Sequence, residues 1–263
     1  MLLRVLMENS ALHEGFIAEH GLSLYIEANG RKILFDAGQT DAFAKNAEKL
    51  GVDLAAVDLC VLSHGHYDHS GGLMRFLELN DHAPVCMHHL AAQPHYNGTI
   101  KYIGINERLS GHPRIILTGE ETDLGSGMKL FTCNHLAKGC PASARGMTVR
   151  LGDTFVQDGF AHEQYLVIEE AGRRIVISGC SHKGILDIAS WLEPDVLIGG
   201  FHFVKLDPAG ADRAFMEDAA RQLLARDCVY YTGHCTGEAA FAFLKERMGD
   251  GLNAMPAGTE IIL

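Results

Sequence analysis

The sequence predicts an α/β protein built as a layered sandwich of two similar halves. Strand-length apolar segments alternate with amphipathic helical segments, and the same order of elements occurs twice along the chain. One segment near the N-terminus, Leu24–Gly38, also aligns without gaps to Leu166–Cys180, at an offset of 142 residues at both ends. The repeated order and the repeated segment together indicate a duplicated architecture.

Each copy of the repeat has the pattern of a β-hairpin. An apolar run leads to an Asn-Gly pair in the first copy and an Ala-Gly pair in the second, and another apolar run follows the pair. Glycine accepts the positive φ angles that a two-residue hairpin turn requires. Six of the 15 aligned pairs are identical, which supports the same hairpin in both copies.

The elements after each hairpin also correspond. In both halves we expect a helix and then a strand, followed by a further helix and a further strand. The predicted helices are Asp41–Leu50, Leu73–Leu79, Gly184–Leu192 and Ala209–Arg226, and the predicted strands are Val57–Leu62, Pro84–Met87, Asp195–Phe201 and Cys228–Thr232.

We expect residues 1–263 to form one domain. No Pro/Ser-rich linker, low-complexity tract or run of like charge marks a boundary within the 263 residues. Two segments, about 91–113 and 133–162, are rich in Gly, Pro, His and Asn and show weak periodicity. Such segments in a compact domain are typical of lids or binding loops, so we expect irregular lids there.

Composition and charge exclude several classes of protein. The net charge is −11, with 22 basic and 33 acidic residues and no basic cluster, which argues against a nucleic-acid partner. No apolar run approaches the roughly 20 residues of a membrane span, and the N-terminus lacks the pattern of a signal peptide. The seven cysteines include no Cys-x-x-Cys pair, so a disulfide framework is not expected. We therefore expect a cytoplasmic protein with a small-molecule substrate.

A cluster of metal-ligand residues directly follows the predicted strand Val57–Leu62. His64 and His66 are two residues apart, so in extended chain both imidazoles face the same side. Asp68 and His69 are adjacent at the turn into the next helix, where neighbouring side chains diverge. One pair can hold one metal ion and the other pair a second, since imidazole and carboxylate suit zinc, iron and manganese.

These motifs resemble those of a known family. The segment Ser63–His69 resembles the His-x-His-x-Asp-His signature of the metallo-β-lactamase superfamily, and Phe35–Gly38 resembles its Asp-x-Gly strand end. Segments 179–185, 199–203 and 232–237 resemble the 7,8-dihydropterin-6-yl-methyl-4-(β-D-ribofuranosyl)aminobenzene 5'-phosphate synthase-like subfamily. The resemblance implies a four-layer αββα sandwich that is pseudo-duplicated, in agreement with the internal repeat.

The resemblance also implies a centre of two divalent metal ions, with zinc expected first and iron or manganese as alternatives. It places His64, His66 and His162 at the first ion and Asp68, His69 and His234 at the second. Cys180 stands where most of the superfamily has an aspartate that bridges both ions. A thiolate is a softer ligand, and His182, two residues later, is the alternative ligand at this position.

Two further residues are assigned roles beside the ions. His202 ends the strand that duplicates the one before His64, so we expect it at the same rim, as a proton donor, a metal ligand or a structural residue. Asp36 is expected to hydrogen-bond a ligand histidine rather than to bind metal. Other histidines, among them His20 and His95, are interpreted as background or surface residues.

The implied reaction is hydrolysis of an ester, thioester, lactone or phosphoester by metal-activated water. In this hypothesis Asp68 orients the nucleophile, and His202 or His182 protonates the leaving group. One alternative is a metal-dependent transferase that joins a pterin to an aminobenzene ribose phosphate. Another is a di-iron redox or sensor protein, which Cys180 leaves open. The segment Tyr96–Ile105 leaves a homodimer open as well.

Overall fold

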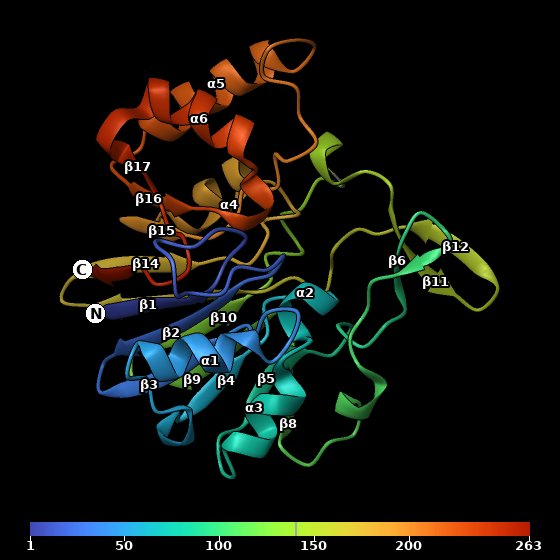
Figure 1. The fold of residues 1–263 in the computed structure, drawn as a ribbon. Coiled ribbons are helices and arrows are strands. Elements are labelled where there is room, and N and C mark those ends of the chain that lie inside the picture. Colours follow the sequence, from blue (N-terminus) through green and yellow to red (C-terminus); the bar gives the residue numbers. More distant parts are fainter. Residues whose placement is uncertain (140) are drawn as a thin grey trace.

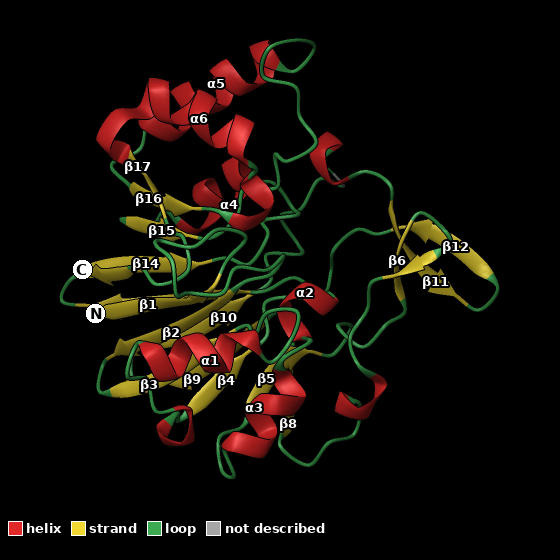
Figure 2. Cartoon of the chain, viewed as in Figure 1, coloured by secondary structure: helices red, strands yellow, loops and turns green. Residues whose placement is uncertain are grey.

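A computed structural model describes residues 1–139 and 141–263. Its described residues form two seven-stranded sheets and a smaller third sheet (Figures 1 and 2). The first sheet has the order β18 (Glu260–Ile262), β1 (Leu2–Met7), β2 (Ser23–Ala28), β3 (Arg31–Phe35), β4 (Leu59–Val61), β5 (Val85–His88) and β8 (Ile115–Thr118). The second has the order β17 (Leu252–Ala254), β16 (Val229–Thr232), β15 (Val196–Ile198), β14 (Arg173–Ile177), β13 (Tyr165–Glu170), β10 (Met128–Phe131) and β9 (Glu121–Gly125).

Helices cover the outer face of each large sheet (Figure 1). The first sheet is covered by α1 (Ala42–Lys49) and α3 (Leu73–Leu79), with the short α2 (Tyr67–Ser70) between them in sequence. The second sheet is covered by α4 (Ile185–Leu192), α5 (Arg213–Leu224) and α6 (Glu238–Met248). The result is the four-layer αββα sandwich, so the predicted fold class is confirmed.

Alternation along the strands explains the layers. In β14, Ile175 and Ile177 pack between the two sheets, whereas Val176 points to the opposite face and packs under α4 and α5. In β3, Phe35 packs between the sheets and Leu34 packs under α1 and α3. Successive strand residues face opposite sides of a sheet. In the central strands of the large sheets both sides are apolar because these strands are buried on both faces.

The internal repeat is confirmed as two matching hairpins. Leu24 pairs with Phe35 in the first hairpin, and Leu166 pairs with Ile177 in the second, which is the same register. Both central turn residues have positive φ in each copy, at 49° and 75° for Asn29-Gly30 and 52° and 76° for Ala171-Gly172. These are the angles of the hairpin turn that favours a right-handed twist.

The elements differ from their predicted bounds mainly at their ends. The strands β4 and β15 are three residues long and the chain leaves the sheet earlier than predicted, because the segments that follow them turn into the loops that carry polar side chains. The strands β1, β8, β9, β10, β17 and β18 were not predicted, since they lie outside the repeated pattern.

The two segments expected to be irregular contain a small sheet, so that expectation is wrong in part. The small sheet has the order β12 (Thr154–Gln157), β11 (Met147–Leu151), β6 (His95–Asn97) and β7 (Lys101–Tyr102). It projects from the sandwich on the side of α2 (Figure 1). Short strands rich in polar residues carry weak periodicity, and β6 pairs with a strand about fifty residues away. Among the described residues, no helix is long and apolar enough to cross a membrane.

Candidate metal centre

The predicted metal ligands converge at one edge of the sandwich, where the carboxyl ends of strands from both sheets meet. His64 and His66 follow β4, and Asp68 and His69 lie in α2. From the second sheet, Cys180 and His182 follow β14, His202 follows β15 and His234 follows β16. The side chains are buried, although the sheets that carry them are separate. Loops at strand ends are where a rigid scaffold can aim several side chains at one point.

One buried carboxylate sets the proton positions on two of the histidines. Asp36 Oδ1 accepts from the Ser63 backbone N–H at 2.7 Å, and Oδ2 accepts from the Ser63 hydroxyl at 2.7 Å. The same Oδ2 lies 2.6 Å from His69 Nδ1. An ionised carboxylate only accepts hydrogen bonds, so a neutral His69 ring carries its proton on Nδ1 and leaves Nε2 unprotonated.

The same argument extends to His64. Its Nδ1 lies 2.8 Å from the Ser63 hydroxyl oxygen, whose single proton is already donated to Asp36. His64 Nδ1 must therefore be the donor in this contact, which leaves His64 Nε2 unprotonated. The prediction that Asp36 hydrogen-bonds a ligand histidine thus has its geometry in place, and through Ser63 it reaches a second histidine.

Lone pairs of three residues face one another near α2. His69 Nε2 lies 3.2 Å from His234 Nε2, and Asp68 Oδ2 lies 3.3 Å from the same His234 atom. His234 Nδ1 lies 2.8 Å from the Asn9 side-chain oxygen, an acceptor, so its Nε2 is also unprotonated. Donors on one tetrahedral zinc ion lie about 3.3 Å apart, given bonds of about 2.0–2.1 Å. A cation among these atoms removes the repulsion between their lone pairs, so the residues fit a metal ion.

Charge at this position points the same way. Burial favours the neutral form of His69, but the carboxylates of Asp36 and Asp68 outweigh it and raise the pKa of His69. Burial would raise the pKa of Asp68, yet His69, His20 and His234 hold it well below its usual value. The carboxylates therefore favour a positive charge between them.

A second group of donors adjoins the first. His64 Nε2 lies 3.2 Å from His182 Nε2, and donor atoms of His64, His66 and His182 lie within 4.8 Å of one another. His66 Nε2 is buried and has no hydrogen-bond partner among the described residues. Burial, followed by neighbouring imidazoles, lowers the pKa of all three rings well below the usual value. Neutral imidazoles with available lone pairs are suitable metal ligands.

Cys180 lies between the two groups. Its Sγ is 3.2 Å from His69 Nε2, and its donor atom also groups with those of His182 and His202. Burial raises the pKa of the Cys180 thiol, and the neighbouring Cys235 and Asp68 raise it further. The structure therefore brings both Cys180 and His182 to the site, where the sequence offered them as alternatives for one position.

Glu163 fixes the loop that carries His182. This fully buried carboxylate accepts from the backbone N–H groups of His182, at 2.7 Å, and Lys183, at 3.1 Å. The Tyr165 hydroxyl donates to it at 2.7 Å. Charge-assisted hydrogen bonds to two successive amides hold the loop in one conformation.

His202 stands beside this loop with both ring nitrogens available. Its ring centroid is 4.3 Å from that of His182, and neither nitrogen has a hydrogen-bond partner in the part of the chain that the structure describes. His202 has a φ of 55°, and Asp36, Ser181 and His234 also have positive φ. Such strained residues cluster at functional sites.

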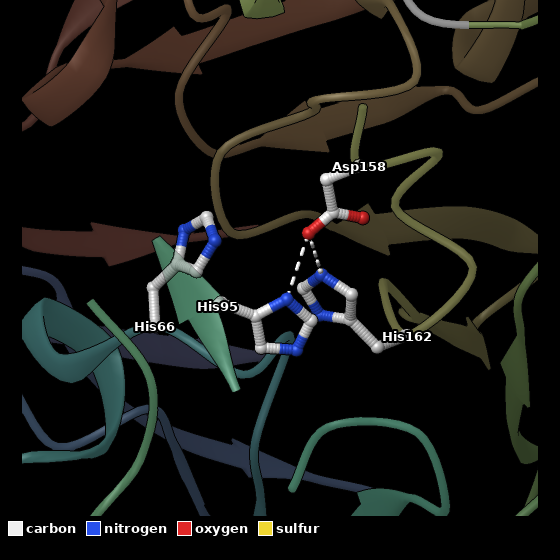
Figure 3. Close-up of side chains that lie close together, drawn as sticks. All are labelled: His66, His95, Asp158 and His162. Carbon is white, nitrogen blue, oxygen red and sulfur yellow. Dashed lines mark hydrogen bonds and ion pairs between the residues drawn. The ribbon is translucent and has the colours of Figure 1, made fainter. Parts of the chain in front are cut away.

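His162 shares a donor group with His66, as expected, but it lies farther from His64 than His182 does. Its ring centroid is 6.1 Å from that of His64, whereas the His182 centroid is 4.8 Å away. Figure 3 shows His162 with His66, His95 and Asp158; these four buried residues have donor atoms within 4.8 Å of one another. Asp158 Oδ2 lies 2.7 Å from His95 Nδ1 and 3.3 Å from His162 Nε2.

Sequence reasoning missed several residues of this region. His95 was interpreted as a surface residue, but it is fully buried and paired with Asp158. His20, treated as background, has Nε2 at 3.2 Å from Asp68 Oδ2. Asn9 was not considered at all. Each reaches the site from a distant part of the chain, so no spacing in the sequence could reveal it.

Comparisons with known proteins bear on this arrangement. A sequence model of the family described as the metallo-β-lactamase superfamily matches residues 17–142. The crystal structure of Tm1679, a metal-dependent hydrolase of the β-lactamase superfamily, superposes with a TM-score of 0.85 and 28% identity over 100% of this chain and 99% of that one.

The chain is therefore similar to the metallo-β-lactamase superfamily, in sequence over residues 17–142 and in fold over its length.

Two curated relatives from Methanocaldococcus jannaschii resemble this chain over most of its length. An uncharacterised protein is 28% identical and covers 93% of this chain and 94% of its own length. A 7,8-dihydropterin-6-methyl-4-(β-D-ribofuranosyl)-aminobenzene-5'-phosphate synthase is 29% identical and covers 92% and 90%. The resemblance to that synthase therefore extends over most of the chain. The superfamily match itself ends before Cys180, His182 and His234, so the second half of the site rests on the structure.

Proposed function

We propose that this protein is a metal-dependent hydrolase that uses two divalent ions to activate water against an ester, thioester or phosphoester of a small molecule. His64, His66 and His182 would hold the first ion, and Asp68, His69 and His234 the second. Cys180 faces both groups. Zinc is the proposed metal, since imidazole and thiolate donors suit it.

One observation carries the proposal. His64, His69 and His234 each have Nδ1 occupied by a polar partner, so that each turns an unprotonated Nε2 toward the same region. Such partners fix the ring and its tautomer in metal sites. Two adjacent groups of this kind support two ions rather than one.

The residues around the two groups have separate tasks in this proposal. When bound, the ions would lower the pKa of a shared water and polarise the substrate oxygen. Asp68 Oδ2 accepts hydrogen bonds and can orient the attacking water. His202, with two free ring nitrogens, can donate a proton to the leaving group. His20, half-exposed and in contact with Asp68, can reach a substrate bound beside the second ion.

Metal content tests the binuclear centre. Protein purified without chelator and without air is measured by plasma mass spectrometry, as wild type and as Asp68→Ala. We expect about two equivalents per chain in the wild type and about one in the variant, because Asp68 contributes to the second group only. No bound metal in the wild type would refute the proposal. The matched control His82→Asn changes an exposed histidine and should retain both ions.

Activity tests the reaction class. The wild type is incubated with generic phosphodiesters and thioesters, and turnover is compared with His202→Gln. We expect turnover by the wild type and a loss of about 100-fold or more in the variant at unchanged metal content, the size typical of a lost general acid. Equal turnover by both proteins would show that His202 does not donate the proton to the leaving group.

A second candidate function has one observation in its favour. The relative named as an aminobenzene-phosphate synthase covers 92% of this chain. A transferase of that type would leave generic phosphodiesters and thioesters intact while binding a pterin. Intrinsic pterin fluorescence, quenched on addition of metal-loaded protein that hydrolyses none of the esters, would favour the transferase.

A further inference from the structure

The histidine just before β13, His162, carries its proton on the opposite ring nitrogen from His64, His69 and His234. Gly65 N–H lies 2.9 Å from His162 Nδ1, and a backbone N–H can only donate. His162 Nδ1 is therefore the acceptor in this contact and carries no proton. A neutral imidazole has one proton, so in His162 that proton is on Nε2.

Asp158 accepts a hydrogen bond from this Nε2–H group. Its Oδ2 lies 3.3 Å from His162 Nε2 and 2.7 Å from His95 Nδ1, and its Oδ1 accepts from the Phe160 backbone N–H at 2.7 Å. Figure 3 shows the carboxylate facing both imidazoles. The 2.7 Å separation is that of a hydrogen bond and is shorter than the roughly 3.3 Å between donors on one zinc ion. Asp158, His95 and His162 therefore form a hydrogen-bonded network, and His66 lies beside it without a hydrogen bond to any of the three.

We infer that His162 is a positioning residue, not a metal ligand. Both of its ring nitrogens are in use, one holding the Gly65 amide and the other donating to Asp158. Gly65 stands between His64 and His66, so this contact fixes the turn that aims both imidazoles. The inference rests on the proposed metal centre and deepens it, because it assigns the third ligand of the first ion to His182.

The space around Gly65 shows how tightly this turn is held. A Cβ atom at Gly65 would lie 2.2 Å from the backbone oxygen of Ala91, so the turn has no room to shift toward that segment. On its other side the amide is held by His162. The small sheet supplies the rest of the brace, since His95 lies in β6 and Asp158 directly follows β12.

Three variants separate a ligand from a positioning residue. In His162→Asn the side-chain oxygen can occupy the place of Nδ1 and accept from Gly65 N–H, whereas His162→Ala has no acceptor. Asparagine is a poor zinc ligand, so a ligand role predicts the loss of one equivalent in both variants. We expect His162→Asn to retain about two equivalents, with His162→Ala binding the first ion about 10–100-fold more weakly. We expect His182→Ala to fall to about one. Loss of an ion in His162→Asn, with both ions retained in His182→Ala, would overturn the inference.

A second readout does not depend on metal binding. Long-range proton–nitrogen NMR correlations of the imidazoles report which ring nitrogen carries the proton, and the His162 signals are identified by their absence from His162→Asn. We expect the proton on Nε2 of His162 and on Nδ1 of His64, His69 and His234. A proton on His162 Nδ1 would refute the inference. If the wild type binds no metal, the proposed function fails but this measurement still decides the tautomer.

Discussion

The two halves of the molecule end their matching hairpins with different chemistry. The first hairpin leads into Asp36-Ala37-Gly38, and the second, 142 residues later, leads into Ser178-Gly179-Cys180. Asp36 organises histidines of its own half, whereas the Ser178 hydroxyl pairs with the Ser181 hydroxyl at 2.7 Å. Cys180, in place of a glycine, offers its side chain to the centre. The same hairpin scaffold thus occurs twice, but the end of the first copy orients histidines and the end of the second copy presents a candidate ligand.

The halves also differ in how their donors are arranged along the chain. The first half contributes His64, His66, Asp68 and His69 from a single six-residue stretch. The second half contributes Cys180, His182 and His234 from the ends of two different strands. In the first half the buried Asp36 carboxylate orients the donors of a single stretch. In the second half the donors are spaced by separate strand ends, and the buried Glu163 carboxylate holds the loop of one of them, His182.

Removing the organiser of the first half should have the largest effect. Asp36→Asn replaces an acceptor by a group that also donates, so neither His64 nor His69 keeps its proton arrangement. We expect both ions to bind about 10–100-fold more weakly, as outer hydrogen-bond partners of ligands typically affect affinity. Titration against a chromophoric chelator measures this. The corresponding change in the other half, Ser178→Ala, should leave both affinities unchanged, and a loss confined to one ion in Asp36→Asn would contradict the proton argument.

The next effect concerns the packing of the two loops that carry the proposed metal ligands. A Cβ at Gly71 would lie 2.0 Å from the backbone oxygen of Gln39, whereas the nearest atom to a Cβ at Gly184 is a Pro141 side-chain atom at 3.4 Å. We expect Gly71→Ala to lower the free energy of unfolding by about 3 kcal/mol through overpacking. Gly184→Ala should cost about 1–2 kcal/mol, because only its φ of 100° is unfavourable for alanine.

Denaturant unfolding compares these two variants. Gly119→Ala serves as the control, since no atom lies within 4 Å of its added Cβ and its φ is not positive. Equal losses in Gly71→Ala and Gly184→Ala would show that the first loop is not the more tightly packed one.

The thiol of the second half provides a spectroscopic comparison. With cobalt in place of the native metal, a sulfur-to-cobalt charge-transfer band reports a bound thiolate. We expect Cys180→Asp to lose this band while keeping about two ions, because a carboxylate can replace the thiolate as a ligand. Cys60→Ala, which alters a buried thiol in β4 away from the centre, should keep the band. A band that survives Cys180→Asp would show that the thiolate ligand is another cysteine.

The smallest effect compares the two hairpin turns. Ala171 has a φ of 52° without the asparagine that its counterpart Asn29 provides. Ala171→Asn should raise the free energy of unfolding by about 0.5 kcal/mol, since asparagine tolerates this conformation better than alanine. Asn29→Ala should have the opposite and larger effect, because the Asn29 amide also donates to the backbone oxygens of Ser126 and Glu169. Thermal unfolding of both variants measures the difference, and equal stabilities would show that the turns are not limiting.

What could be predicted from the sequence follows from how local the signal is. The hairpins were predicted because a turn of two residues fixes the register of its own strands. The donors from His64 to His69 were predicted because they also lie close together in the sequence. The small sheet was not, because β6 and β11 are short, polar and far apart in sequence. Asn9, His20 and Asp158 meet the site only through tertiary packing, which no spacing in the sequence encodes.

The two proposed ion positions depend on the same residue, because the proton arrangement around Asp36 extends to both donor groups. His64 belongs to one donor group and His69 to the other, yet the same carboxylate dictates the tautomer of both rings. A homologue without this carboxylate would lose the proton arrangement of both donor groups together, while its apolar layers and hairpin registers would be unchanged. Homologues with an intact sandwich and an altered residue at this point should therefore bind both ions more weakly, rather than lose only one of them.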